Sequence, residues 1–165
     1  MKKRFKFNAD TFLLLAFLIM LLLFISSSMT YKQQTSVPFL EKYLAKKPFN
    51  NFLNGFSFVY AKERVSIASI GYFKFVEFFI RKGAHFFSYL LLGTFFYLGL
   101  KPRLNSTVLS VLICALSTVG YAALDEYHQL LTGGRTPLFQ DVILDGIGGL
   151  AGILIFGIYF SSKQK

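Results

Sequence analysis

The sequence predicts an all-α polytopic membrane protein: a bundle of four transmembrane helices with a long outer segment of short amphipathic helices and a small hairpin. Of its 165 residues, 54% are hydrophobic and 21 are phenylalanine, which is more apolar side chain than a soluble domain of this size can bury. Four apolar runs approach the about 20 residues that cross ~30 Å of hydrocarbon. The basic residues lie mostly just outside these runs, where they would meet lipid head groups.

We expect a single membrane domain over residues 1–165. Because a backbone in hydrocarbon must satisfy its own hydrogen bonds, each apolar run is expected to be a helix. The expected helices cover residues 9–29, 84–100, 107–124 and 142–160, with the outer segment at 31–82 and an outer loop at 126–141. The first run has a second interpretation, as a cleaved signal peptide, which would leave three helices.

Positive charges in the short flanks predict the orientation. These charges are Lys2, Lys3, Arg4 and Lys6 before the first helix, Lys101 and Arg103 between the second and third, and Lys163 and Lys165 at the end. Four crossings place all of them on one side, which the rule identifies as the cytoplasm. We therefore expect a multi-pass protein of the cell membrane with both termini in the cytoplasm.

The outer segment carries its own periodicities. Phe49, Phe52, Leu53 and Phe56 recur at the spacing of an amphipathic helix, which predicts a short helix resting on the head-group layer. Phe56, Phe58 and Tyr60 alternate before the turn-like residues 61–64, and this pattern predicts a small hairpin.

Polar residues gather near three helix ends. Arg81, His85 and Tyr89 are four residues apart and would share one face of the second helix, and Asp141, Asp145 and Gly149 would share one face of the fourth. Ionisable groups at membrane depth are costly and mark functional sites. Since alternating helices bring these ends to the same face, the sequence predicts one outward-facing binding site, formed by Arg81, Lys82, His85, Asp125, Glu126, Gln129, Arg135, Asp141 and Asp145.

Two other residue types have structural interpretations. Gly148 and Gly152 form a small-xxx-small pair, which indicates close helix packing. His128 lies off the face that holds Asp125 and Gln129, and we expect it to face head groups without taking part in the site.

Three function classes fit the pattern. A non-enzymatic protein could hold an anionic or lipid-linked envelope molecule on Arg81, Lys82 and Arg135. A membrane enzyme could use His85, Glu126 and Asp141 as catalytic groups, although Gly-x-Ser-x-Gly and His-Glu-x-x-His motifs are missing. The charges could also serve only to hold helices together in an assembly partner. No motif indicates a metal or cofactor, and the dispersed basic residues do not indicate nucleic-acid binding.

Several of these residues occur in an ordered set. The run Phe78–Phe86 with Tyr89, then Asp125-Glu126-Tyr127-His128-Gln129, Arg135 and Asp141 with its glycine-rich helix resemble the VanZ-like family. The family often has asparagine at the position of Asp145. Its name-giving member is associated with low-level resistance to teicoplanin, a lipid-tailed glycopeptide that acts at the outer membrane face. The resemblance therefore implies a cell-envelope protein, with membrane lipids, a lipid-linked cell-wall precursor or a lipoglycopeptide as partners.

Overall fold

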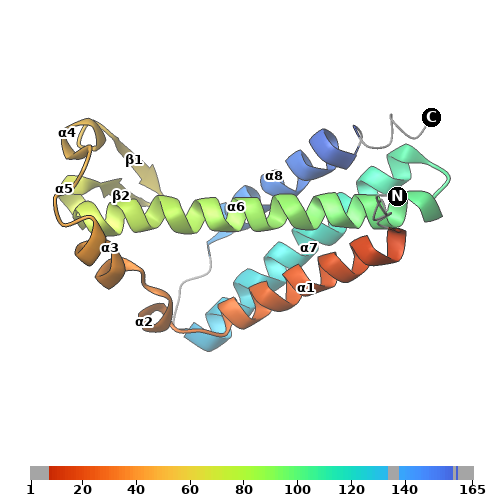
Figure 1. The fold of residues 1–165 in the computed structure, drawn as a ribbon, viewed down its shortest axis with the longest axis horizontal. Helices are drawn as coiled ribbons and strands as arrows, with labels where there is room; N and C mark the ends of the chain where they lie inside the picture. Colours follow the sequence, from red (N-terminus) through yellow and green to blue (C-terminus); the bar gives the residue numbers. More distant parts are fainter. Residues whose placement is uncertain (1–7, 134–137, 158, 160–165) are drawn as a thin grey trace, which may run out of the picture.

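Four long helices form the bundle of this protein, shown in Figure 1 from a computed structural model that describes residues 8–133, 138–157 and 159. They are α1 (Ala9–Ser27), α6 (Tyr72–Leu100), α7 (Thr107–Gly133) and α8 (Phe139–Gly152), the last continued by a π-helical turn, η2 (Ile153–Gly157). The described chain thus holds four helices long and apolar enough to cross a membrane. This confirms the all-α polytopic fold.

Helix α1 has the exposure pattern of a helix against lipid. Its start is capped by Asn8, whose Oδ1 accepts a hydrogen bond from the Thr11 amide at 2.8 Å. Ala16 and Leu23 are buried against α6 and α7, whereas Leu22 on the outside is 66% exposed. Leucine can occupy both faces because the surroundings of the bundle are as apolar as its interior.

Helices α6 and α7 are longer than the apolar runs that predicted them. Helix α6 begins at Tyr72 rather than at residue 84, and α7 continues to Gly133 rather than ending at residue 124. Residues 126–133, expected in a loop, are therefore helical. Hydropathy marks only the apolar part of a helix, and these helices continue past their apolar runs with polar side chains. Helix α8 likewise begins at Phe139 instead of residue 142.

Glycines bring α6 and α8 into backbone contact. A Cβ at Gly148 would approach the Phe86 carbonyl and one at Gly152 the Leu90 carbonyl, each at less than the 3.0 Å that real Cβ atoms respect. Only glycine permits this approach. The contact confirms the packing role predicted for both glycines and fixes how the polar residues of α6 and α8 face each other.

Residues 31–71, which we call the amphipathic unit, connect α1 to α6. They form α2 (Tyr31–Gln34), α3 (Val37–Tyr43), α4 (Asn50–Leu53), β1 (Ser57–Tyr60), β2 (Glu63–Ser66) and α5 (Ile67–Ile70). The strands pair antiparallel, with Tyr60 opposite Glu63, and Ala61 and Lys62 between them both have positive φ. Two such residues form the tight turn that fits the twist of a hairpin. The predicted short helices and hairpin are confirmed.

The opposite end of α6 leads into α7 through a short 3-10 helix, η1 (Lys101–Arg103). In Figure 1 this connection, the start of α1 and the end of α8 lie together at one end of the bundle, whereas the amphipathic unit lies at the other. Helices α6 and α8 and the far end of α7 thus present their polar residues toward the end that carries the unit.

Candidate functional site

A lysine and an aspartate join α6 to α8. The Lys82 ammonium donates to both carboxylate oxygens of Asp141, at 2.5 and 2.6 Å, and their side chains are 23% and 17% exposed. Tyr60 of the hairpin donates its hydroxyl to the same carboxylate, and its ring lies 4.9 Å from the Lys82 ammonium. Asp141 is in the first turn of α8, where the helix dipole also favours a negative charge.

A second pair lies one helical turn deeper. His85 Nδ1 and Asp145 Oδ2 are 3.2 Å apart, and the Asp145 side chain is 4% exposed. The next residue on this face of α6 is Tyr89, whose ring lies 6.5 Å from the His85 ring. The sequence predicts that Asp141, Asp145 and Gly149 share one face of α8, and in the structure all three contact α6.

Helix α7 contributes two buried acids and an amide. Glu126 accepts a hydrogen bond from the Leu138 amide at 2.6 Å, which ties α7 to the start of α8. Asp125 accepts one from Gln129 at 3.3 Å. Glu126 lies within electrostatic reach of Asp141, Lys82 and His85, and Asp125 within reach of His85 and Asp145. Lys82, His85, Asp125, Glu126, Gln129, Asp141 and Asp145 therefore form one group, which we call the charged cluster.

The charged cluster contains two buried carboxylate oxygens with bonding capacity to spare. Asp125 Oδ1 and Asp145 Oδ1 make no hydrogen bond to another described residue by strict geometry, and the buried hydroxyl of Tyr89, outside the cluster, lies near Asp125. An unpaired buried polar group costs about 1–3 kcal/mol, so folded proteins rarely leave one unless it has a further partner. The two carboxylate oxygens are the part of the cluster with unused bonding capacity.

Negative charge exceeds positive charge in the cluster. Its described members include four carboxyl groups, one permanent cation and one histidine, and the cation is already paired with Asp141. A ligand here would gain most by donating hydrogen bonds or bringing positive charge.

One described residue predicted for the site, Arg81, is placed differently. The Arg81 guanidinium lies over the ring of Tyr31, 5.4 Å from its centre, and so faces α2. The shared face on α6 is formed by Lys82, His85 and Tyr89 instead of Arg81, His85 and Tyr89. Arg135 lies outside the described residues.

His128, which is half-buried, packs against the end of α1. Its Nδ1 is 2.8 Å from Ser27 Oγ, and its ring stacks on Phe24 with centroids 4.4 Å apart. Both partners belong to α1, so His128 joins α7 to α1.

Among the described residues, no group of three histidine, cysteine, aspartate or glutamate side chains is arranged to hold a metal ion.

Sequence reasoning missed Tyr60 and Glu77. Burial raises the pKa of the Tyr60 hydroxyl, and the hydrogen bond to Asp141 raises this pKa further, so the phenol keeps its proton as a donor. Nothing in the local sequence pairs residues this far apart. Glu77, 3% exposed, is an acid inside a phenylalanine-rich stretch, and this misfit in composition is a signal that could have singled it out.

An apolar groove lies on the outer surface of α7 and α8. It has a volume of about 300 Å³ and is lined by Ala115, Val119, Phe139, Val142, Ile143, Gly146, Ile147 and Leu150. Phe139 directly follows Leu138, whose amide is bound by Glu126 of the cluster. The groove thus runs along the bundle from a point beside the charged cluster.

A bundle of membrane-spanning helices with acids and bases gathered toward one end defines this chain as a multi-pass membrane protein with a buried polar site. Comparison with known proteins supplies the family: the VanZ/LLP1 family model matches residues 12–160, and the chain belongs to that family. The match covers α1 and the amphipathic unit as well as the motifs from Phe78 onward. No curated protein and no solved structure gave a match.

Proposed function

We propose that this protein is a non-enzymatic binding protein whose charged cluster recognises the polar head of a lipid-linked or lipid-tailed envelope molecule. The observation that carries the proposal is the pair of buried carboxylate oxygens, Asp125 Oδ1 and Asp145 Oδ1, for which the strict geometry gives no hydrogen bond among the described residues. A head group with hydroxyl or amino groups would supply the missing donors.

The groove between α7 and α8 supports the choice of an amphiphile. Its lining is apolar, and Phe139 at one end adjoins the residue that Glu126 binds. A molecule with its head in the cluster could therefore lay one hydrocarbon chain along α8. Because the groove faces lipid, a chain there gains close van der Waals packing against α7 and α8 rather than transfer out of water, so the groove contributes shape selectivity more than affinity.

The charges of the cluster refine the expected ligand. An anion held by Arg81 and Lys82 has little support, since Arg81 stacks on Tyr31 and Lys82 is paired with Asp141. The favoured ligand is a glycosylated or amine-bearing head, as in a lipid-linked cell-wall precursor or a lipoglycopeptide of the teicoplanin type. A phosphate on the same molecule would have to compete with Asp141 for Lys82.

Binding to a lipid-linked cell-wall precursor tests the proposal. With purified protein in lipid nanodiscs and a fluorescent precursor as probe, we expect saturable binding without turnover. Asp125→Asn and Asp145→Asn should each weaken binding about ten-fold, the loss of one hydrogen bond to a charged group. Asp10→Asn, at an exposed aspartate near the start of α1, is the matched control. Equal binding by all four proteins would overturn the proposal.

A second function, acid–base catalysis on the same molecule, is favoured by one observation. The hydrogen bond that His85 Nδ1 donates to the Asp145 carboxylate orients the His85 ring, as a catalytic histidine requires. Turnover of the labelled precursor by the unaltered protein, abolished in His85→Gln, would establish the enzyme and exclude the binder.

We further propose that the charged cluster faces the outside of the cell membrane. The positive flanks of the first helix, of the connection at Lys101 and Arg103, and of the C-terminus support a cytoplasmic location for the other end. A periplasm-type enzyme reporter fused after residue 135 should be active, and one fused after residue 103 inactive. The reverse pattern would place the cluster in the cytoplasm.

Resistance to teicoplanin is a consequence that we propose from the family resemblance. If the cluster binds the sugar or amine groups of this lipid-tailed glycopeptide, expression of the chain should raise the inhibitory concentration, and Asp125→Asn should remove the increase. An equal increase in inhibitory concentration with the Asp125→Asn variant would mean that resistance does not depend on the charged cluster.

A further inference from the structure

The amphipathic unit has an inner face that is used by the fold and an outer face that is not. Leu40 and Val65 are 5% and 6% exposed, and Tyr72 and Phe75 at the start of α6 are 5% and 0% exposed. Tyr72 also donates a hydrogen bond to the Pro48 carbonyl at 2.9 Å, which fixes the unit to α6. The unit is therefore folded against the start of α6 through a buried inner face.

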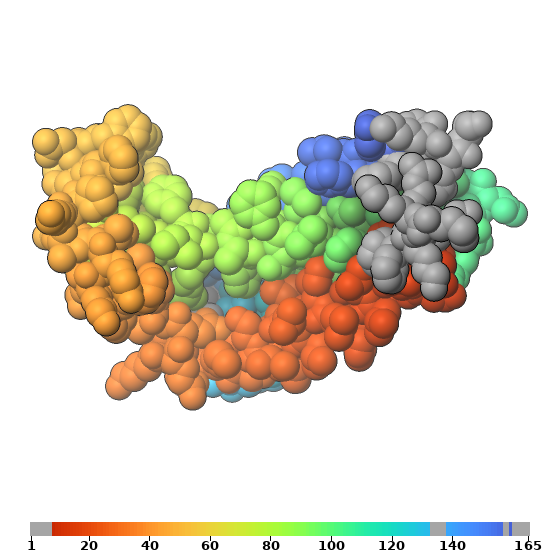
Figure 2. Space-filling view, viewed as in Figure 1, coloured from red at the N-terminus to blue at the C-terminus, as the bar shows by residue number. Residues whose placement is uncertain are grey.

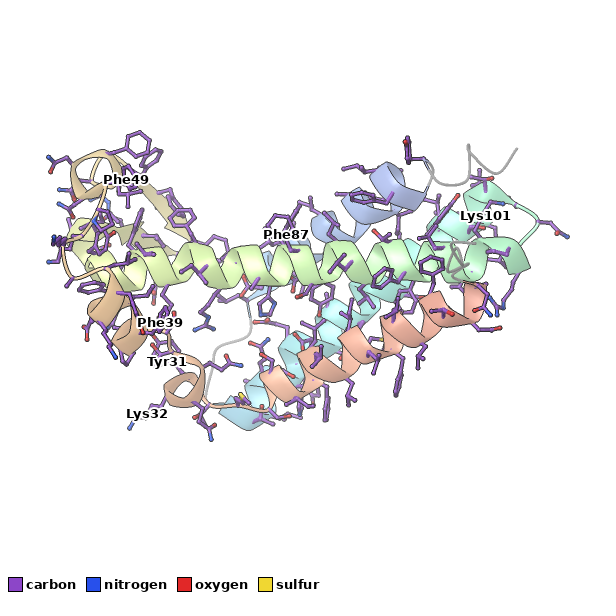
Figure 3. All side chains as sticks on the ribbon, in the orientation of Figure 1. Tyr31, Lys32, Phe39, Phe49, Phe87 and Lys101 are labelled. Carbon is purple, nitrogen blue, oxygen red and sulfur yellow. The ribbon has the colours of Figure 1, made fainter. Side chains whose placement is uncertain are left out.

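Its outer face is rich in large apolar side chains. The exposed fractions are 62% for Phe39, 64% for Tyr43, 79% for Phe49, 68% for Phe52 and 71% for Val59. Figure 3 labels Phe39 on α3 and Phe49 in the turn before α4, at different places on the unit. None of these side chains is needed to bury the inner face, and exposed apolar surface on this scale marks an interaction site.

The same unit is basic. Residues 31–71 contain six basic residues (Lys32, Lys42, Lys46, Lys47, Lys62 and Arg64) and two acidic residues, Glu41 and Glu63, a net charge of +4. Aromatic side chains interleaved with lysines are the composition of segments that lie in the membrane interface.

A hollow in the surface of the unit is lined by both basic and aromatic side chains. It has a volume of about 460 Å³ and is lined by Lys46, Lys47, Phe49, Asn50 and Asn51. Lys47 and Phe49 both have positive φ, a backbone conformation that is uncommon for residues other than glycine. Ammonium and amide donors around a concave surface suit the phosphate of a lipid head group.

Helix length places the unit at the depth of the head groups. Helix α6 has 29 residues and is about 43 Å long, which exceeds ~30 Å of hydrocarbon by about 13 Å. Figure 2 shows the unit at the projecting end of α6, continuous with the end of α1. Because α1 also enters the unit directly, the unit is held near the membrane surface from two sides.

We propose that the amphipathic unit binds the head-group layer of an anionic lipid surface, with its aromatic side chains inserted and Lys46 and Lys47 on lipid phosphates. The partner is the lipid layer itself, and the proposal is independent of what the charged cluster binds. Through this contact the unit would enrich anionic lipids in the part of the membrane next to that cluster.

The chain has no tryptophan, so one introduced indole reports on one site. With full-length Phe49→Trp in proteoliposomes, we expect quenching by brominated phosphatidylglycerol to exceed quenching by brominated phosphatidylcholine about two-fold or more, since each basic residue near the surface attracts anionic lipid. Adding Lys46→Gln and Lys47→Gln should remove the difference. A second reporter, Phe52→Trp, should repeat both results if the substitution at residue 49 disturbs its turn.

Leu116→Trp on an exposed side of α7 is the matched control, because Leu116 is 71% exposed and belongs to an apolar stretch of α7 outside the basic unit. Both lipids should quench it equally. The proposal is overturned if the two reporters in the unit are quenched equally by both lipids, or if a water-soluble quencher reaches them while neither lipid does. The latter result would instead indicate an exposed surface for a soluble partner.

Discussion

Lys82 on α6 and Asp141 on α8 meet at 2.5 Å with less than a quarter of either side chain exposed. The pair joins α6 to α8 at the end of the bundle that carries the amphipathic unit, and the Tyr60 hydroxyl of the hairpin donates a hydrogen bond to the same Asp141 carboxylate. Because the pair is partly desolvated, removing one member leaves an uncompensated charge, whereas removing both does not.

Lys82→Met should therefore lower the free energy of unfolding by about 1–3 kcal/mol, less than a fully buried pair would because both side chains retain some solvent. Asp141→Leu should restore most of the loss in the Lys82→Met background. Thermal melting in detergent measures both effects. Arg103→Met is the control, since its partner Asp10 is 80% exposed, and it should change stability by no more than about 0.5 kcal/mol. Equal losses at the two sites would mean that the Lys82 pair is not desolvated.

Tyr60→Phe should loosen the hairpin from the cluster. The variant loses the hydroxyl that donates to Asp141, so hydrogen exchange of residues 57–66 should speed up while α8 keeps its protection. Tyr43→Phe, at an exposed tyrosine of α3, should leave exchange unchanged. Unchanged exchange in Tyr60→Phe would show that the hairpin is held by its phenylalanine contacts alone.

The raised pKa of Tyr60 also predicts a dependence on alkaline pH. Burial and the bond to Asp141 favour the protonated phenol in the folded state, so this stabilisation is complete below the ordinary tyrosine pKa of about 10. It is lost as pH rises above that value, because only the unfolded chain then releases the proton. Tyr60→Phe should melt with a shallower loss of stability over this range than the unaltered protein.

Much of this architecture was readable from the sequence. Helix spacing predicted that Asp141, Asp145 and Gly149 share a face, and hydropathy predicted four helices. Hydropathy could not locate the helix ends, because α6 and α7 continue past their apolar runs into polar sequence. Neighbouring residues on a helix point about 100° apart, so either Arg81 or Lys82 could face the cluster. The choice is made by tertiary contacts: Arg81 stacks on Tyr31 of α2, which leaves Lys82 to pair with Asp141. The bond from Tyr60 to Asp141 joins segments with no local relationship.

Glu77 is predicted to anchor the start of the amphipathic unit. Its carboxylate accepts hydrogen bonds from the Tyr31 hydroxyl at 3.0 Å, the Thr35 hydroxyl at 2.8 Å and the Ser36 amide at 2.5 Å. Glu77→Ala should cost about 1.5–3 kcal/mol and expose the chain between α1 and α3 to proteolysis. Glu41→Gln, at an exposed glutamate of α3, should have neither effect. A Glu77→Ala variant as resistant to protease as the unaltered protein would contradict this role.

The glycine contacts between α6 and α8 predict that an added methyl group lowers the stability of the protein at a contact glycine but not at an open one. Gly152→Ala should cost about 1–3 kcal/mol, because its Cβ would meet the Leu90 carbonyl and neither backbone can yield freely. Gly120→Ala on α7 is the control. Nothing lies within 4 Å of its Cβ position, so alanine there should be neutral or stabilising. Melting temperatures of the two variants compare them directly, and equal values would mean that the two helices pack less closely.

The central claim is that one molecule places its head in the charged cluster and its chain along α8, and photo-crosslinking tests it most directly. A photoreactive phenylalanine analogue at Phe139 should capture a labelled lipid-linked precursor, with competition by unlabelled precursor and loss of capture in Asp145→Asn. The same analogue at Phe17, which is 60% exposed on α1, should capture only background. Equal, uncompeted capture at both positions would contradict the claim.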